Sequence, residues 1–207
     1  MTMPAFTIFV VDDDTAVLKA LTRLLRVNGL SIQTFSSPLE FLLRHDPSVP
    51  GCAILDLSMP GLDGLKLQQE LATQHAELPV IFITGKGDIS TGIRAMKAGA
   101  VDFLTKPVRD SELLAAIEQA RERVVKITEA RAQLDSIKAR LARLTPREHE
   151  VLALVVAGRL NKQIASELGT VEKTIKVHRG RMMKKMGVRA VADLVRMAEK
   201  ANIRPQD

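Results

Sequence analysis

The sequence predicts an α/β protein in which a doubly wound, five-stranded parallel sheet is followed by a long helix and a small all-α domain. Two observations point to this fold. Through the first half of the chain, short apolar runs alternate with segments of helical periodicity, as in βαβ units. The second half shows helical periodicity alone, and 207 residues suit two small domains better than one core.

The first half is expected to hold five strands and five helices, and right-handed crossovers would place helices on both faces of the sheet. Gly and Pro residues punctuate the pattern between these elements. The expected strands are residues 8–11, 31–35, 53–56, 80–83 and 102–105. The expected helices are 15–28, 38–43, a segment containing Leu65, Leu67 and Leu71, about 90–98, and one that Asp110 or Ser111 can cap.

Polar residues stand where four of the strands end. Because the carboxyl ends of parallel strands meet at one edge, where wound sheets bind their ligands, these residues should lie together. Any one of them alone would suit a loop or a helix cap, but their shared edge favours a site. They are Asp12, Asp13, Asp14, Asp56, Thr84 and Lys106.

The residue types at this edge suit phosphoryl chemistry. Crowded carboxylates repel one another, and Mg²⁺ would offset them while taking two carboxylates, a backbone carbonyl and waters as ligands. Lys106 supplies a compact positive charge and Thr84 a hydroxyl donor, and both suit the oxygens of a phosphoryl group. An Asp held beside Mg²⁺ can act as the nucleophile toward a phosphoryl donor.

Four motifs resemble those of the receiver domain of two-component response regulators, which has a flavodoxin-like fold, over roughly the first 120 residues. The resemblance implies that Asp56 accepts a phosphoryl group from a sensor histidine kinase and that Lys106-Pro107 is a cis peptide. It also implies that the chain takes part in its own phosphotransfer and dephosphorylation without being an enzyme. The motifs are Val-Val-Asp-Asp at 10–13, Leu-Asp-Leu-Ser-Met-Pro-Gly at 55–61, Ile-Thr-Gly at 83–85 and Phe-Leu-Thr-Lys-Pro at 103–107.

The same resemblance assigns roles around Asp56. Phe103 stands where the family has an aromatic residue that rotates inward on activation, although an aromatic residue in a strand is ordinarily core. Thr84 and Lys106 would bind the phosphoryl oxygens. The implied Mg²⁺ ligands are Asp12, Asp13, Asp56 and the backbone carbonyl of Ser58.

Two further positions, Ser58 and Lys86, lie two residues beyond Asp56 and Thr84, where that family varies. Both are expected near the water path to the phosphoryl group. We expect Lys86 to alter the lifetime of the phosphoprotein, although a solvated loop lysine fits its position equally well.

Composition restricts the class of protein. Hydrophobic residues make up 46% and charged residues 26%, as in a folded globular protein. No apolar run approaches the roughly 18 residues that span a bilayer, and no leader segment is recognisable, so a cytoplasmic protein without a membrane partner is expected. Cys52 is alone and suits a buried strand, and the four histidines lack metal-ligand spacing.

Charge divides the chain unevenly. Residues 1–122 carry a net charge of −4 and residues 123–207 a net charge of +10. The basic half suits a polyanion, although a solvated helical surface would have a similar composition.

A nearly continuous helix from residue 111 to about 144 should join the halves, because Gly and Pro are absent there. Its apolar residues approach a heptad that Arg131 and Lys138 interrupt. A helix that pairs between subunits and a solvated spacer both remain open. The expected domains are 1–120, the helical linker 121–143, and 144–207.

The second half predicts a helix-turn-helix. Thr145-Pro146-Arg147-Glu148 is a capping box that should begin a helix, and Gly158 should end it. Short helices at 161–168 and about 171–186 follow, separated by Gly169, and a last helix spans about 189–201. Val171, Ile175, Met182 and Met186 are expected to point inward. The outer face left by that spacing is basic and suits a major groove about 12 Å wide.

This half, from about 142 to 204, resembles the LuxR-type DNA-binding domain of NarL/FixJ regulators, closest to the FixJ branch. The motifs are Leu-Thr-Pro-Arg-Glu at 144–148, Asn-Lys-Gln-Ile-Ala at 161–165 and Thr-Ile-Lys-Val-His at 174–178. In that family the last helix forms the dimer contact, here with Leu194 and Val195. The implied base-edge contacts are Lys173, Lys176, Val177 and Arg181, and the implied phosphate contacts are Lys162, Thr174, His178 and Lys185.

The chain departs from that family at two helix caps. Val171 and Ala190 stand where the recognition helix and the last helix usually have Ser. A lost hydroxyl cap costs on the order of 1 kcal/mol. Thr170 offers an alternative cap one residue earlier, and Val171→Ser is expected to stabilise the domain.

The resulting hypothesis is a response regulator whose phosphorylation on Asp56 promotes homodimerisation and binding to double-stranded promoter DNA, with RNA polymerase as a further partner. By resemblance to the FixJ branch, one receiver face is the expected dimer contact, and pairing of the first and fifth helices is the alternative. The residues of that face are Arg94, Met96, Lys97, Ala100 and Phe103.

Three other classes of protein fit the sequence less well. An Asp-nucleophile phosphohydrolase would have a second acid two residues after the nucleophile, where Ser58 stands. A ligand-sensing LuxR regulator would need an apolar pocket in the first half instead of carboxylates. A DNA-binding protein independent of phosphorylation is disfavoured by the complete acidic set.

Overall fold

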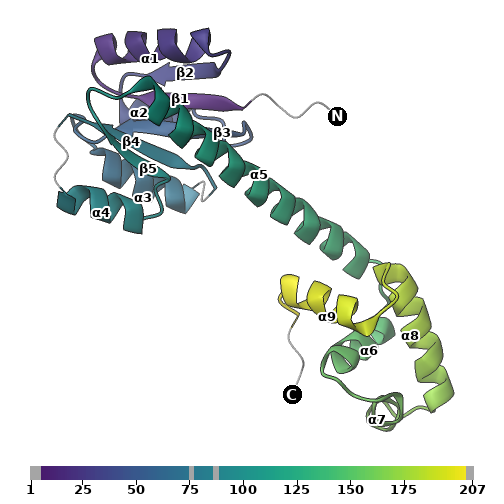
Figure 1. Cartoon of the computed structure of the whole chain (residues 1–207). Helices are drawn as coiled ribbons and strands as arrows, with labels where there is room; N and C mark the ends of the chain where they lie inside the picture. The colour runs from purple at the N-terminus through teal and green to yellow at the C-terminus, as the bar shows by residue number, and fades with distance from the viewer. Residues whose placement is uncertain (1–5, 75–76, 86–88, 204–207) are drawn as a thin grey trace. The chain divides into compact units, whose positions relative to one another are not determined.

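A computed structural model describes residues 6–74, 77–85 and 89–203. The chain divides into two compact units, Met1–Thr128 and Glu129–Asp207 (Figure 1). Among the described residues, no helix is both long and apolar enough to cross a membrane.

The first unit is built on a parallel five-stranded sheet in the order β2-β1-β3-β4-β5. Each strand pairs with its neighbours in parallel, and the central strands β1, β3 and β4 are buried along their whole length. The predicted doubly wound sheet is therefore confirmed, with strand limits shifted by one or two residues. The strands are β1 (Thr7–Val11), β2 (Ser31–Phe35), β3 (Gly51–Asp56), β4 (Val80–Thr84) and β5 (Asp102–Thr105).

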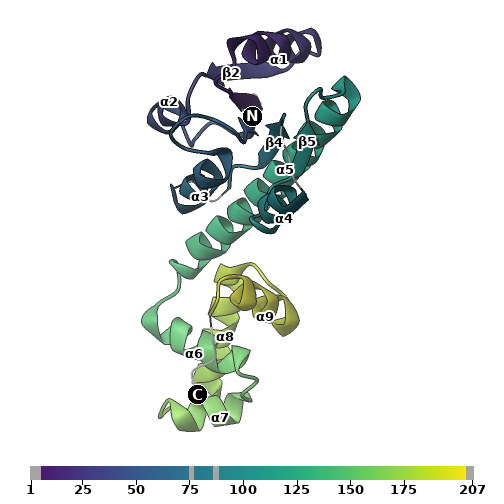
Figure 2. The same cartoon turned by 90° about the vertical axis from the view of Figure 1, so that its left-hand side faces the viewer.

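Helices cover both faces of this sheet (Figures 1 and 2). One face, with Leu55 and Phe82, packs against α2, α3 and α4, and the other, with Ile54 and Ile81, packs against α1 and the first turns of α5. The alternation of side chains along each strand produces these two cores. The helices are α1 (Thr15–Val27), α2 (Pro38–Arg44), α3 (Gly64–Gln74), α4 (Ile89–Lys97) and α5 (Asp110–Leu141).

Local caps set where several helices begin. The side chain of Asp14 accepts a hydrogen bond from the amide of Ala16 and caps α1. Ser37 caps α2 in the same way, with Pro38 in its first turn. These side chains satisfy amide groups that a helix start leaves without a partner.

Helix α5 is continuous over 32 residues and ends at Leu141, three residues before the expected end. Leu113, Ala116 and Ile117 are buried against the sheet of the first unit. In its last turns, Ile137 is buried within the second unit, which begins at Glu129. The helix therefore contributes to both units.

The second unit is helical, with α6 (Pro146–Val156), α7 (Asn161–Glu167), α8 (Glu172–Met186) and α9 (Val191–Lys200) around one apolar core (Figure 2). The predicted capping box at Thr145 and Glu148 is present. Ile175, Met182 and Met186 point inward as predicted, but the prediction for Val171 is wrong. Val171 is the N-cap of α8 and is 65% exposed, because the first turn of α8 projects beyond the core.

Candidate functional site

The first candidate site lies at the carboxyl edge of the sheet. Val11 is in register with Leu55, so the residues that follow them, Asp12 and Asp56, lie side by side on adjacent strands. Thr84 pairs in register with Thr105, and the amide of Lys106 donates to the carbonyl of Thr84. The sheet thus gathers the residues that the sequence predicts for this edge.

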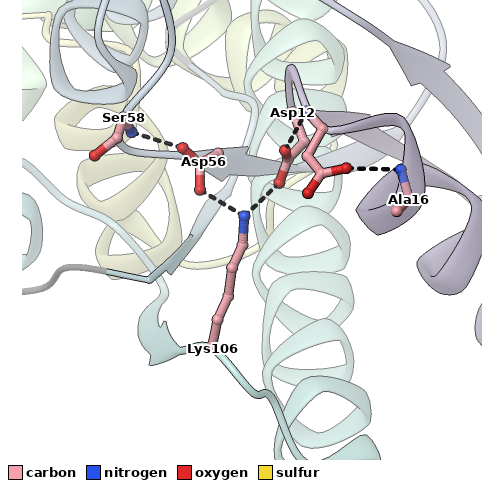
Figure 3. Close-up of polar contacts among 6 residues, drawn as sticks. Asp12, Ala16, Asp56, Ser58 and Lys106 are labelled. Carbon is pink, nitrogen blue, oxygen red and sulfur yellow. Dashed lines mark hydrogen bonds and ion pairs between the residues drawn. The ribbon is translucent and has the colours of Figure 1, made fainter.

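The ammonium group of Lys106 joins the two buried carboxylates (Figure 3). Its Nζ lies 2.7 Å from Oδ2 of Asp12 and 2.8 Å from Oδ1 of Asp56. The second oxygen of Asp56 accepts a hydrogen bond of 2.6 Å from the backbone amide of Ser58. Asp56 is therefore held by two donors, and only 7% of its side chain is exposed.

Burial and neighbouring charges shift the pKa values of Asp12 and Lys106 in opposite directions. Burial raises the pKa of Asp12, and the hydrogen bond from Lys106 reduces but does not cancel that effect. Burial lowers the pKa of Lys106, but its hydrogen bonds to Asp12 and Asp56 outweigh burial, so the net shift is upward. The lysine therefore stays charged, as two neighbouring carboxylates require.

The remaining predicted site residues differ in accessibility. Asp13 is exposed, whereas Thr84 is fully buried at the end of β4. Within the part of the chain that the structure describes, no three Asp, Glu, His or Cys side chains are gathered in a way that could hold a metal ion. The peptide bond between Lys106 and Pro107 is cis, as the resemblance implies.

Phe103 lies partly buried on β5. Its ring centroid is 6.4 Å from that of Phe82, and its ring atoms would lie 3.5 Å from a Cβ placed on Gly92 of α4. The side chain thus sits between the sheet and α4, beside the strand that ends at Thr84. The side chain of Ser58 is exposed near the same edge, and Lys86 lies outside the described residues.

The second candidate site is the outer face of α8. Lys173, Lys176, Val177 and Arg181 are exposed, and Thr174 and His178 are half-buried. Lys162, at the start of α7, is also exposed. The structure thus leaves a basic surface along the second helix of a helix-turn-helix.

The comparisons with known proteins assign a family to each half of the chain. Residues 8–118 match the response regulator receiver domain, and residues 142–198 match the bacterial regulatory proteins of the luxR family. The chain belongs to the response regulators with a LuxR-type DNA-binding domain. The receiver match alone spans more than half of the chain.

Individual response regulators resemble the chain over almost its whole length. Nodulation protein W of Bradyrhizobium diazoefficiens is 48% identical over 196 residues, covering 95% of this chain and 86% of that protein. The transcriptional regulatory protein FixJ of Rhizobium meliloti is 39% identical and covers 95% and 96%. The structure of response regulator StyR, 44% identical, gives a TM-score of 0.81 and covers 95% of this chain and 99% of that one.

The predicted contact face of this response regulator is only partly available. Arg94, Met96 and Lys97 are exposed on α4. Ala100 is 6% exposed and packs in the sheet core, so the prediction for Ala100 as a surface residue is wrong. Gly99 has a positive φ, the amide of Ala100 donates to the carbonyl of Ala95 in α4, and the next residue, Val101, donates to the carbonyl of Val80 in β4.

Lys185 is held by an ion pair. Its Nζ lies 2.6 Å from Oε2 of Glu148, which is 2% exposed and also accepts a hydrogen bond from the amide of Thr145. The lysine that is predicted to contact a phosphate therefore already joins α8 to the start of α6. Sequence spacing placed Lys185 outside but did not indicate its partner.

The caps of α8 and α9 lack side-chain hydrogen bonds. Val171 and Ala190 have the extended backbone of an N-cap without a side chain that could accept one. The cap of α8 is Val171, so the alternative with Thr170 is wrong. The amide of Thr170 instead donates to the carbonyl of Ala165 at the end of α7.

Sequence reasoning missed one residue that supports the phosphoacceptor site. A Cβ on Gly64 would lie 2.3 Å from the backbone oxygen of Asp56, so only glycine lets α3 begin this close to β3. The amide of Gly64 donates to the carbonyl of Leu57. The sequence feature that could have indicated this role is a glycine at the start of a helix, where a residue with an oxygen-bearing side chain is more usual.

Proposed function

We propose that phosphorylation of Asp56 by a sensor histidine kinase switches this response regulator, and that the phosphorylated form dimerises and binds promoter DNA. The observation that carries this proposal is the buried pair of carboxylates, Asp12 and Asp56, held by one ammonium at the sheet edge. Such a pocket already compensates negative charge, which a phosphoryl group would increase.

In the proposed transfer, a carboxylate oxygen of Asp56 attacks the phosphorus of a phosphohistidine on the kinase. The P–O bond forms as the P–N bond breaks, and the imidazole keeps the electron pair. Lys106, 2.8 Å from Oδ1 of Asp56, would then donate a hydrogen bond to the phosphoryl oxygens and stabilise their negative charge. The amide of Ser58 holds the other carboxylate oxygen and fixes the orientation of the nucleophile.

The residues present fit Mg²⁺. Lys106 joins the buried carboxylates of Asp12 and Asp56, and the exposed Asp13 would have to turn toward them to complete the set of ligands. All available donors are hard oxygens, including the backbone carbonyl of Ser58. When bound, Mg²⁺ would neutralise charge on the transferring phosphoryl group, and Asp12, Asp13, Asp56 and Ser58 would hold it.

Thr84 and Phe103 would transmit the conformational change that follows phosphorylation of Asp56. Thr84 is fully buried, so its hydroxyl must turn toward the edge to reach a phosphoryl oxygen. Phe103 lies partly exposed against α4 and could fill the space that Thr84 leaves. This movement would alter the surface formed by α4 and β5.

The proposed dimer contact is that surface. Besides Arg94, Met96 and Lys97, α4 exposes Ile89 and Ile93, which are 84% and 50% exposed. Pairing would bury these apolar side chains. Pairing through α1 and α5 remains the alternative, and substitutions on α4 that leave phosphorylation-dependent dimerisation intact would favour it.

The proposed DNA contact is α8. Lys173, Lys176, Val177 and Arg181 would approach base edges, and two recognition helices of a dimer would reach half-sites about one helical turn apart. Lys162, Thr174 and His178 would contact phosphates. Lys185 is proposed to contribute mainly through Glu148, its partner at 2.6 Å.

The proposed limits are 1–120 for the receiver, 121–143 for the linker and 144–207 for the DNA-binding domain. The proposed partners are the kinase, duplex promoter DNA, a second copy of the chain and RNA polymerase. A protein that binds the chromosome of a bacterium would act in the cytoplasm.

The test is molecular mass in solution, measured with Mg²⁺ before and after addition of acetyl phosphate, in parallel with Asp56→Asn. We expect phosphate incorporation and a doubling of mass in the wild type, and neither in the variant. Incorporation without a change in mass would contradict phosphorylation-driven dimerisation. Incorporation into Asp56→Asn would contradict the assignment of the phosphoacceptor.

A further inference from the structure

Among the described residues, Gly92 of α4 and Gly180 of α8 lie in helix interiors, and only Gly92 has a side chain near the place of a Cβ. A Cβ on Gly92 would lie 3.5 Å from the ring of Phe103, an ordinary contact that leaves little room for a larger side chain. A Cβ on Gly180 of α8 would meet no atom within 4 Å. Nothing inside the described part of the chain requires glycine at position 180.

Glycine has a conformational cost in the middle of a helix. It loses more backbone freedom on folding than any other residue and is the poorest helix former except proline. Gly180 lies nine residues into the 15-residue α8, away from either end. It has no positive φ that would favour glycine, unlike Gly169 and Gly187 at the ends of α7 and α8. Local structure therefore offers no reason for its presence.

The surroundings of Gly180 indicate what approaches it. Residues three, four and seven positions apart share one face of a helix, which places Gly180 between Lys173, Lys176 and Val177 on one side and Lys184 on the other. All of these residues are exposed. We call this set, with Gly180, the Gly180 face.

The Gly180 face is cationic and apolar, without acidic residues. The sole carboxylate of α8 is Glu172 in its first turn, which pairs with Lys176 at 3.0 Å. No ion pair within the described residues involves Lys173 or Lys184. Val177 is 46% exposed and adds an apolar surface beside the glycine. This chemistry fits an anionic, closely packed partner such as a DNA strand.

We propose that Gly180 is a DNA-contact position, at which the missing side chain lets duplex DNA approach the backbone of α8 directly. The inference rests on the proposed DNA binding. It adds one contact residue, which acts through its small size and carries no charge. Glycine is the residue that permits close approach of a backbone to a ligand. A Cβ at this position would hold the backbone of α8 away from the base edges that Lys173, Lys176 and Val177 are proposed to approach.

The test compares Gly180→Ala and Gly180→Leu in the full-length chain, with acetyl phosphate and Mg²⁺ present. The probe is a duplex that the wild-type protein selects from a random-sequence pool. We expect affinity to fall by about tenfold for Ala, the size of one lost base-pair contact, and further for Leu. Thermal unfolding should occur at the same or a higher temperature, because both residues form helix better than glycine.

The salt dependence of DNA affinity distinguishes an effect of side-chain size from the loss of a charged contact. The Gly180 variants should keep the wild-type slope of log affinity against log salt, since no charge is removed. Lys184→Ala should instead reduce that slope by about one. Ala139→Leu, at an exposed position on α5, adds bulk away from α8 and should leave affinity unchanged.

The outcomes distinguish this inference from the function on which it rests. Wild-type affinity in Gly180→Leu would overturn the inference and leave DNA binding intact. A lowered unfolding temperature in Gly180→Ala would assign the glycine to folding and also overturn it. A wild-type protein that selects no duplex would contradict the proposed function itself. Normal DNA affinity with lost promoter activity would assign the Gly180 face to a protein partner, against the proposal.

Discussion

At the residue scale, Lys106 is the group on which the phosphoacceptor pocket depends. It is 26% exposed, yet both of its partners are almost completely buried. Removing one member of such a set leaves the others buried without compensation, which costs more than the pairing itself gains. The lysine therefore has a structural role that precedes any contact with a phosphoryl group.

We predict that Lys106→Met destabilises the receiver by about 1–3 kcal/mol, because two carboxylates then face each other without a cation. Mg²⁺ should restore more stability in this variant than in the wild type, because it no longer competes with the ammonium. Thermal unfolding with and without Mg²⁺ measures both effects. Lys66→Met, at an exposed lysine on α3, is the control. Equal Mg²⁺ stabilisation of variant and wild type would contradict competition between Mg²⁺ and the ammonium of Lys106.

In the second unit, the buried carboxylate of Glu148 depends on the ammonium of Lys185, as Asp12 and Asp56 depend on Lys106. The hydrogen bond from Lys185 is the main cause of its lowered pKa, and the amide of Thr145 adds to it. A carboxyl group whose pKa is lower in the folded state contributes stability above its unfolded pKa, here near 4.5. That contribution disappears as pH falls through the lower, folded pKa.

We predict that Glu148→Gln lowers the unfolding temperature of the DNA-binding unit at pH 7. The difference from wild type should begin to shrink as pH falls below about 4.5, the unfolded pKa, and should disappear once pH has fallen through the lower pKa of the folded carboxyl group. Unfolding curves between pH 3 and pH 7 test this, provided that the two units unfold separately. Glu150→Gln, which breaks an exposed pair with Arg147, should have a much smaller effect. A difference that stayed constant with pH would remove the charge argument.

At the scale of elements, the helices of the second unit differ in how they begin. Helix α6 has a complete capping box, whereas α8 and α9 begin with Val171 and Ala190. The first amides of α8 therefore have no side-chain acceptor at the cap. Two arginines also bind helix ends, since Arg140 of α5 donates to the carbonyl of Met186 and Arg147 of α6 donates to that of Leu168. Part of the basic character of this unit therefore stabilises its own helices.

We predict that Val171→Ser stabilises the DNA-binding unit by about 1 kcal/mol, because the backbone at this position already has the extended conformation of a cap. Val171→Ala is the matched control, since it removes the exposed side chain without adding a hydroxyl. The comparison of unfolding free energies isolates the hydrogen bond. A serine variant no more stable than the alanine variant would contradict the prediction.

At the scale of the whole molecule, the two halves of the chain that differ in charge also differ in fold. The acidic half forms the sheet with its carboxylate edge, and the basic half forms the helical unit that carries α8. The boundary between compact units falls at Thr128 and Glu129, within α5, and not at the ends of a separate linker. Arg140 in the last turns of α5 belongs to the second unit and donates to the carbonyl of Met186, so this end of α5 is held to the end of α8.

The order of elements and the chemistry at the sheet edge follow from the amino-acid sequence alone. Alternating apolar runs and their terminal residues were sufficient to predict that Asp12, Asp56, Thr84 and Lys106 would share one edge, since parallel strands allow no other arrangement. The capping box at Thr145 was equally readable, because its residues interact within one helical turn.

Which side chains are paired, buried or exposed depends on packing between elements. The ion pair of Lys185 with Glu148 and the burial of Ala100 depend on contacts between segments distant in sequence. The same holds for Gly64, whose necessity comes from the backbone of Asp56, and for Gly180, whose neighbourhood is empty. Periodicity specifies the face on which a residue lies, but packing between elements determines what that face meets.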